Sequence, residues 1–319
     1  MLKPRFVAGM ISIGLMVLGA RVVCGQNYPT RPIRILSAEV GGGADFVARI
    51  VAQRISGPLG RQVVVENRPS RLIGEIAVKA TPDGYTLLLA SSTFLFAPLF
   101  GETLYDPVKD FSPITMLAKA PNVIVVHPSV PVTSVKELIA LAKAKPGALN
   151  YGSGGTGSSL HLAAELFKQM AGVDIARIAY KGAGPAMNDL IGGQVQMVFA
   201  TAGSVTAHVK SGRLRALAVT GLQPSALAPG LPTVAASGVP GYEVEAIYAL
   251  VAPAKTPAAV IKQLNQVIVL VLNEADLKEK FLNAGIEAAP SSPVELAAKI
   301  RSEIVKIAKL IKDEGIRAN

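Results

Sequence analysis

The stretch that decides the fold is Asn150–His161, read as Asn-Tyr-Gly-Ser-Gly-Gly-Thr-Gly-Ser-Ser-Leu-His. It follows a short strand-like run at 148–151 and leads into a helical pattern that begins near Leu162. Glycines let the backbone approach a ligand without a Cβ in the way, and Ser158 or Ser159 can cap the helix. The first N–H groups of a helix lack internal partners and carry partial positive charge. This turn is therefore predicted to bind a small anion.

A second turn of the same kind lies upstream. A strand is expected at 34–36, followed by the turn Gly41-Gly42-Gly43 and a helix over 44–59. Two glycine-rich helix openings about a hundred residues apart indicate two lobes, each of which offers one anion-binding helix end. This pairing is the hypothesis from which the other features of the chain are interpreted.

Length and charge narrow the class of protein. A chain of 319 residues is long enough for two domains of roughly 100–200 residues each. Half of its residues are apolar, which supports a sizeable core and argues against disorder. The formal charge is +10, but the lysines and arginines are scattered along expected helix faces and few aromatic residues accompany them. Solvated helix faces explain this pattern better than a nucleic-acid surface does.

The N-terminus carries the signal for cellular location. Lys3 and Arg5 precede an apolar run over 6–20, and small residues follow around Cys24 and Gly25. This layout predicts a secretory signal peptide over 1–25 and a periplasmic mature protein. A core of about 15 apolar residues is shorter than the roughly 20 of a membrane span, although an uncleaved anchor is the alternative. Cleavage after Gly25 leaves a mature chain without thiols, and hence without disulfides or cysteine-based metal sites.

From Tyr28 onward, short strand-like runs alternate with amphipathic helical patterns, which is typical of parallel α/β layers. Two apolar runs, 123–126 and 245–251, are the candidates for crossings between lobes. The predicted fold is therefore α/β with two lobes, a ligand cleft between them and a hinge of two crossings. Lobe 1 is placed at 26–125 and 247–319, and lobe 2 at 126–246.

Several motifs then follow one another in order along nearly the whole mature chain. They are Tyr28-Pro29, Arg31-Pro32-Ile33, Gly42-Gly43, Val65-Glu66-Asn67-Arg68-Pro69, Pro82-Asp83-Gly84-Tyr85, Tyr105-Asp106-Pro107-Val108-Lys109-Asp110-Phe111, Gly157-Ser158, Tyr180-Lys181-Gly182, Gly192-Gly193-Gln194-Val195 and Gly238-Val239-Pro240-Gly241-Tyr242. With this ordered set the chain resembles the extracytoplasmic solute receptors of the tripartite tricarboxylate transporters, the Bug-type receptors. The resemblance implies a type II-like periplasmic binding protein without catalytic activity, which holds a small carboxylate at its two glycine-rich loops. It also implies membrane subunits of a transporter, or a sensor's periplasmic domain, as partners.

The residues expected to line the cleft combine the two turns with neighbouring strand ends. They are Gly42, Gly43, Asp45, Ser92, Ser153, Gly155, Thr156, Gly157, Ser158, His161, Tyr180 and Lys181. Hydroxyl and backbone donors to a carboxylate contribute about 1.5–3 kcal/mol each, against roughly 0.3–1 kcal/mol for the helix dipole, so direct donors are expected to dominate affinity.

Some of these residues have a structural interpretation beside the ligand-binding one. His161 lies four residues before Glu165 on one helix face, which favours a structural hydrogen bond. Asp45 either fixes the first loop or meets a donor group of the ligand. Lys181 either balances a ligand charge or is solvated.

The chain also departs from the family pattern. The family usually has prolines where Ala38-Glu39-Val40-Gly41 stands, and polar residues where Phe94 and Phe96 stand. Either Glu39 points to solvent, or the ligand presents an amine or hydroxyl to it. Phe94, Phe96 and Phe100 form either an apolar wall for an aromatic or hydrocarbon acid, or part of the core. The resemblance therefore carries the fold to this chain but not the identity of the ligand.

Other functions find less support in the residues. Gly152-x-Gly154-x-x-Gly157 fits a dinucleotide fingerprint, but Tyr180-Lys181 stands where that site wants an acid. An α/β enzyme acting on a small carboxylate would need a nucleophile with a base, and the sequence has no Gly-x-Ser-x-Gly, His-Glu-x-x-His or P-loop. A ligand-sensing regulator would need a helix-turn-helix where the signal peptide stands. With three dispersed histidines, no metal or cofactor is expected, and a monomer is the default.

Overall fold

The fold is described from a computed structural model. It describes residues 28–38, 40, 43–101, 103–154, 157–180, 183–314 and 316. The predicted signal peptide at 1–25 lies outside the described residues, as do Glu39, Gly42, Gly155, Thr156 and Lys181. Within the described ranges, the structure contains no helix with the length and apolar character of a membrane span.

The secondary structure alternates strands and helices along most of the chain. The strands are β1 (Ile33–Ser37), β2 (Val63–Asn67), β3 (Thr86–Ser91), β4 (Phe111–Val126), β5 (Asn150–Ser153), β6 (Ala176–Ala179), β7 (Met197–Thr201), β8 (Arg215–Val219), β9 (Glu245–Pro253) and β10 (Glu287–Ala288). The helices are α1 (Gly43–Leu59), α2 (Ser70–Val78), α3 (Ser92–Phe100), α4 (Val135–Ala144), α5 (Ser159–Ala171), α6 (Ala183–Ile191), α7 (Ala202–Lys210), α8 (Ala258–Leu272), α9 (Ala275–Asn283) and α10 (Pro293–Glu314).

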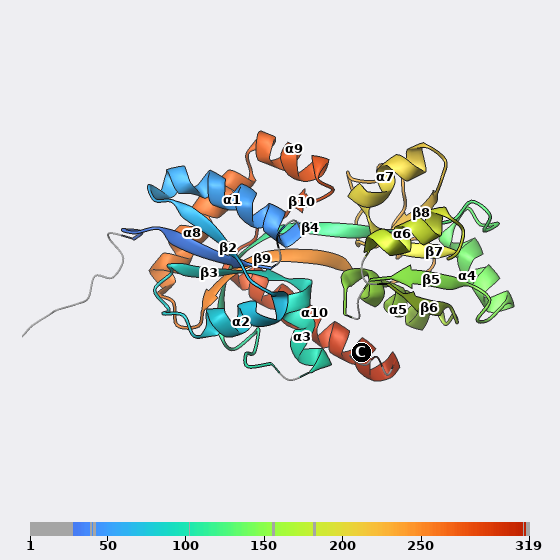
Figure 1. The fold of residues 1–319 in the computed structure, drawn as a ribbon, viewed down its shortest axis with the longest axis horizontal. Helices are drawn as coiled ribbons and strands as arrows, with labels where there is room; N and C mark the ends of the chain where they lie inside the picture. The colour runs from blue at the N-terminus through green and yellow to red at the C-terminus, as the bar shows by residue number, and fades with distance from the viewer. Residues whose placement is uncertain are drawn as a thin grey trace, which may run out of the picture.

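The strands form two parallel groups that share a pair of antiparallel strands. The order is β2-β1-β3-β9-β4-β7-β5-β6, with β8 and β10 also paired to β4. β1 is parallel to β2 and β3, and β5 is parallel to β6 and β7. The strand β4 pairs with β9 over 111–121 and with β7 over 122–126, so it changes partners between Pro121 and Asn122. In Figure 1, β4 and β9 accordingly run from the lobe that contains α1, α2 and α8 toward the lobe that contains α4 to α7.

The predicted two-lobed α/β fold is therefore confirmed, with two long strands as its crossings. The lobe boundaries at 125–126 and 246–247 stay a prediction. The C-terminal helix α10 is a further connection, because it packs against α3 and β4 and also against α5 of the other lobe. Near the C-terminal end of α10, Asp313 Oδ2 accepts a hydrogen bond from Gln169 Nε2 of α5 at 3.1 Å.

Three elements were not expected from the sequence: the helix α3, the first part of β4 and the two-residue strand β10. The helix α3 has no polar face, since Phe94, Leu95 and Phe96 are all buried, and an all-round apolar helix gives no periodic signal. The first part of β4 contains Pro113 and Pro121, which normally argue against an internal strand. Pro113 lies at a register shift, and Pro121 lies where β4 changes partners, so neither proline interrupts a regular ladder.

Candidate functional site

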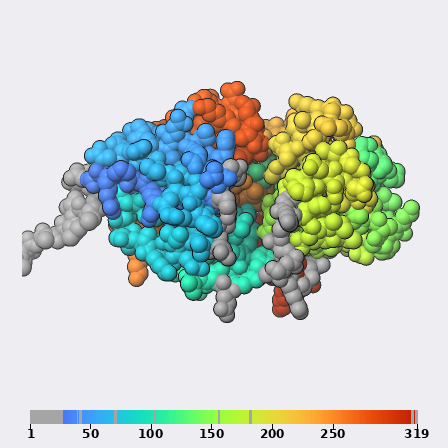
Figure 2. Space-filling model, in the orientation of Figure 1, coloured from blue at the N-terminus to red at the C-terminus, as the bar shows by residue number. Residues whose placement is uncertain are grey.

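The two glycine-rich turns each connect the C-terminal end of a parallel strand to a helix, β1 to α1 and β5 to α5. Open α/β sheets bind ligands at this edge. Figure 2 shows a groove between the lobe that is mainly blue and cyan and the lobe that is mainly green and yellow. Contacts among described residues join the two turns across this groove.

The joining contacts run through β9 and α3. A Cβ atom placed on Gly43 would lie 2.4 Å from Tyr248 Oη of β9. The neighbouring Ile247 N donates to Ser92 Oγ at 3.2 Å, at the first residue of α3. At the other end of α3, about 13 Å along a helix of this length, the Phe100 ring lies against Gly157. A Cβ on Gly157 would lie 2.9 Å from Phe100 Cε2, so the second turn directly contacts the other lobe.

The second turn has a capped helix with uncommitted donors. Ser158 is the N-cap of α5, and its Oγ accepts from His161 N at 3.3 Å. Gly157 N donates to His161 Nδ1 at 3.1 Å, so this N–H is committed to the protein itself. The N–H groups of Ser159 and Leu160 donate to no other group among the described residues. They are therefore the donors of this turn that a bound anion can use.

Ser153 stabilises the second turn through hydrogen bonds inside the protein. Its side chain is fully buried, and its Oγ accepts from Arg177 Nε at 2.8 Å and donates to Gly154 O at 3.1 Å. Arg177 Nη2 also donates to Gly154 O, at 3.2 Å. Arg177 of β6 thus supports the second turn, a role that was not predicted from the sequence. The one feature that could have indicated it is a cation in a four-residue strand that otherwise contains only alanine and isoleucine.

His161 supports the second turn as a neutral ring. It is 2 % exposed, and burial, together with the nearby Arg177 charge, lowers its pKa to about 4. Nδ1 accepts from Gly157 N, so the ring proton belongs on Nε2. The expected structural hydrogen bond is found, but its partner is Gly157. Glu165, the partner that the helix spacing suggested, instead bonds to the Tyr151 hydroxyl and to Lys168 Nζ.

The buried His161 predicts a pH dependence of stability. Between pH 6.5 and about 4 the unfolded chain takes up a proton on His161 that the folded protein does not. The free energy of unfolding should therefore fall as the pH drops through this range, by on the order of 3 kcal/mol, and this contribution should level off below it. Urea unfolding of the wild type and of His161→Asn, between pH 7 and 4, measures the difference. An equal pH dependence in both proteins would contradict the neutral assignment.

Asp45 fixes the first turn. It is 4 % exposed, and its Oδ1 accepts from Arg49 Nε at 2.9 Å and from Asn67 Nδ2 at 2.8 Å. Asn67 Nδ2 also donates to Ala38 O at 2.6 Å. Asp45 thereby ties the start of α1 to the end of β2 and to the residue after β1. Of the two expectations for Asp45, these contacts support the loop-fixing one.

The other expected residues are divided between the groove and the packing around it. Tyr180 donates to Asp189 Oδ2 at 2.7 Å, and burial and this bond raise its pKa to about 12. Phe94 stacks on Tyr105 with ring centroids 4.7 Å apart and belongs to the core. Phe100 alone of the three phenylalanines contacts a glycine turn within the described residues. The structure thus links Gly43, Ser92 and Gly157 through contacts with Tyr248, Ile247 and Phe100, and it commits Tyr180 to α6.

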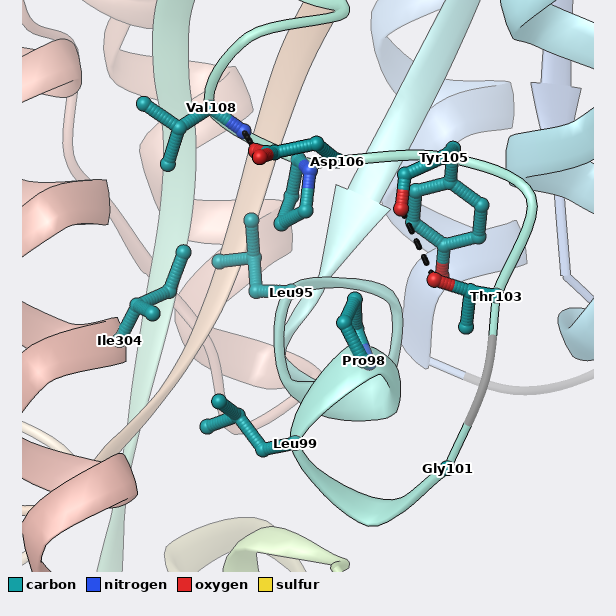
Figure 3. A pocket seen from close by; sticks show the side chains of 10 residues that line it. Leu95, Pro98, Leu99, Gly101, Thr103, Tyr105, Asp106, Val108 and Ile304 are labelled. Atoms are coloured by element: carbon teal, nitrogen blue, oxygen red, sulfur yellow. Dashed lines mark hydrogen bonds between the residues drawn. The ribbon is translucent and has the colours of Figure 1, made fainter.

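A second hollow lies away from both turns, between α3 and α10. Its volume is about 700 Å³, and Leu95, Leu99 and Ile304 line it (Figure 3). The Thr103 hydroxyl at its edge donates to Tyr105 O at 2.8 Å, and Asp106 Oδ1 accepts from Val108 N at 2.8 Å. Because these polar groups are already paired, the hollow offers apolar walls and not an anion site. No cluster of three or more metal-ligand side chains occurs in the described part of the chain.

Comparison with known proteins agrees with this architecture. The model of the tripartite tricarboxylate transporter family receptor matches residues 47–316. The protein BugT of Bordetella pertussis is 34% identical over 96% of this chain and 97% of its own length. The structure of Rpa4515 from R. palustris with adipate has a TM-score of 0.77 and 32% identity, and covers 92% of this chain and 100% of that one.

A further solved structure, MatC (Rpa3494) from Rhodopseudomonas palustris with bound malate, has a TM-score of 0.73 and 25% identity. It covers 89% of this chain and 100% of its own. Family model, relatives and structures agree over nearly the whole described chain. The chain therefore belongs to the family of tripartite tricarboxylate transporter receptors, the solute-binding proteins that include BugT.

Proposed function

We propose that this protein captures a small organic acid between its lobes and presents it to a tripartite transporter's membrane subunits or to a sensor's periplasmic domain. The carboxylate is held between the N-termini of helices α1 and α5. The protein acts in the periplasm, after removal of the segment that begins with Lys3, Arg5 and the apolar run over 6–20. It acts as a receptor and not as an enzyme, as a monomer without cofactor.

The observation that carries the proposal is the pair of N–H groups at Ser159 and Leu160, which have no hydrogen-bond partner among the described residues. They stand at the N-terminus of α5, on a turn whose Gly157 contacts Phe100 of the other lobe. A helix N-terminus of this kind stabilises an anion, and the contact between Gly157 and Phe100 supports a binding position that both lobes can reach. Two structurally similar receptors support the carboxylate assignment, one solved with adipate and one with malate.

The energetics predict selectivity for charged over neutral ligands. Each hydrogen bond from a backbone N–H to a carboxylate is worth about 1.5–3 kcal/mol, and the α5 dipole adds about 0.3–1 kcal/mol. An amide of the same shape keeps the apolar contacts, but its hydrogen bonds are neutral ones of about 0.5–1.5 kcal/mol each and it loses the dipole term. The acid favours the closed arrangement only through contacts that the separated lobes cannot make.

Ligand identification tests the proposal directly. We expect mass spectrometry of protein purified from the periplasm to release an organic acid, and thermal-shift screening to find acids that raise the melting temperature. A ligand that binds only the folded state adds about 2.7 kcal/mol at a hundred times its Kd. The corresponding amides serve as matched controls and should give little shift. Equal shifts with acids and amides, or none with any acid, would remove the carboxylate assignment.

A further inference from the structure

Tyr248 occupies a distinctive place on the hinge strand β9. It pairs with Ser91 at the C-terminal end of β3 and with Ala118 of β4. Its ring packs at the edge of the core beneath α1. From there its hydroxyl reaches the first turn, where a Cβ on Gly43 would lie 2.4 Å from Oη. The phenol oxygen therefore lies at the N-terminus of α1, on a strand that pairs with β3 and β4 and runs toward the other lobe.

The hydroxyl of Tyr248 is unusual among the tyrosines of this chain, of which there are seven. The other six all hydrogen bond to the protein: Tyr28 to Gly84 O, Tyr85 to Thr30, Tyr105 to Phe94 O, Tyr151 to Glu165, Tyr180 to Asp189 and Tyr242 to Ala163 O. Tyr248 Oη bonds to no group among the described residues. A polar group that is half-buried and uncommitted carries a desolvation cost unless a ligand or water compensates it.

Packing alone does not account for this hydroxyl. Phenylalanine would fill the same space beneath α1 and would place no polar atom against the Gly43 backbone. Glycine at 43 is in turn what admits the oxygen, since a Cβ there would overlap it. The hydroxyl and the glycine therefore fit one another at the start of α1, where the first N–H groups of the helix can bind an anion.

We propose that Tyr248 is a ligand-binding residue, whose hydroxyl donates a hydrogen bond to an oxygen of the organic acid at the first turn. This inference rests on the proposed function and deepens it, because it assigns a side-chain donor to the α1 end of the cleft. Burial raises the pKa of Tyr248, which keeps the phenol protonated at neutral pH. The ligand class that fits is an acid with an oxygen acceptor, a carboxylate or hydroxyl, at the end nearest Gly43.

The assignment also divides the cleft into two unlike ends. At the first turn, the Tyr248 hydroxyl accompanies the α1 donors. At the second turn, the Phe100 ring accompanies the α5 donors. A ligand that spans the cleft therefore meets a polar donor near Gly43 and an apolar surface near Gly157. Its carboxylate at the α5 end is expected to be followed by a hydrocarbon segment that packs on Phe100.

The test compares Tyr248→Phe with the matched variant Tyr85→Phe, in which the same atom is removed far from the cleft. Adipate and malate are the first probes, with affinities measured by calorimetry. Tyr248→Phe is expected to weaken binding of the tighter acid about tenfold, which is 1.4 kcal/mol. The ligand-free melting temperature should stay unchanged because the ring is retained. Tyr85→Phe should bind as the wild type does.

A second measurement follows the NMR signal of Tyr248 in the wild-type protein. Protein labelled with [13Cζ]tyrosine gives one signal for each tyrosine, and the signal missing in Tyr248→Phe identifies Tyr248. Saturating acid is expected to shift this signal more than the signals of the six hydrogen-bonded tyrosines. Wild-type affinity in Tyr248→Phe together with an unmoved signal would overturn the assignment while leaving carboxylate binding intact. If the wild type binds neither these probes nor any acid in the screen, the proposed function fails, and this inference fails with it.

Discussion

Replacing Gly203 by valine is expected to weaken binding of the organic acid by about 5- to 150-fold. Gly203 lies in α7 of lobe 2, and Gly285 follows α9 of lobe 1. A Cβ on Gly203 would lie 3.0 Å from Gly285 Cα and 3.3 Å from Ala284 O. The lobes therefore touch here through bare backbone. A branched side chain in this space costs about 1–3 kcal/mol when the lobes are in contact here, and this penalty converts to the stated range.

The expected loss comes from closure and not from the ligand contacts. Each lobe of Gly203→Val should fold normally, because the clash exists only where the lobes meet. Small-angle scattering with saturating acid should give a larger radius of gyration than the wild type gives. Gly57→Val is the matched control, since a Cβ on Gly57 of α1 meets no atom within 4 Å. Wild-type affinity in Gly203→Val would show that acid binding does not require this lobe contact.

Replacing Lys168 by methionine is expected to lower the free energy of unfolding by about 3–5 kcal/mol. Lys168 Nζ lies 2.9 Å from Glu165 Oε2 on α5, and Glu165 also accepts a hydrogen bond from the Tyr151 hydroxyl of β5. The Glu165 side chain is 9% exposed and that of Lys168 is 19%. Removing the cation leaves a buried carboxylate without its counter-charge, which costs more than the intact pair contributes.

A double variant separates the charge effect from loss of packing. In Lys168→Met with Glu165→Gln, neither of the two positions carries a charge, and the glutamine oxygen can still accept from Tyr151. Most of the stability lost in the single variant should return, as measured by urea unfolding at neutral pH. Equal stability of the single and double variants would show that packing, and not the uncompensated carboxylate, sets the cost. A single variant as stable as the wild type would contradict the prediction altogether.

Local sequence chemistry predicted the local structure well. A cap of α5 by Ser158 or Ser159 was expected from their place between a glycine turn and a helical pattern, and Ser158 is the cap. The start of α4 has the same local character, since Ser134 and Glu137 have the spacing of a capping box. There Ser134 Oγ accepts from Glu137 N, and Glu137 Oε2 accepts from Thr133 N. These contacts join residues within one turn of helix, so spacing alone specifies them.

Contacts between distant segments were not predictable in this way. Tyr248 meets Gly43, and Gly203 meets Gly285, because β9 and the two lobes bring together segments with no local relation. Arg177 reaches Ser153 because β5 and β6 are parallel neighbours. A single sequence contains both residues of each contact but does not show that they meet. The parts of the site that depend on packing therefore became visible only in the assembled fold.

A crystal structure of the wild type with its tightest acid tests the central claim most directly. We predict one acid in the groove, with carboxylate oxygens about 2.7–3.2 Å from the N–H groups of Ser159 or Leu160, and its other end at the opening of α1 near Gly43. An acid bound elsewhere, such as in the hollow beside Ile304, or bound in the groove without contact to either helix opening, would contradict the account.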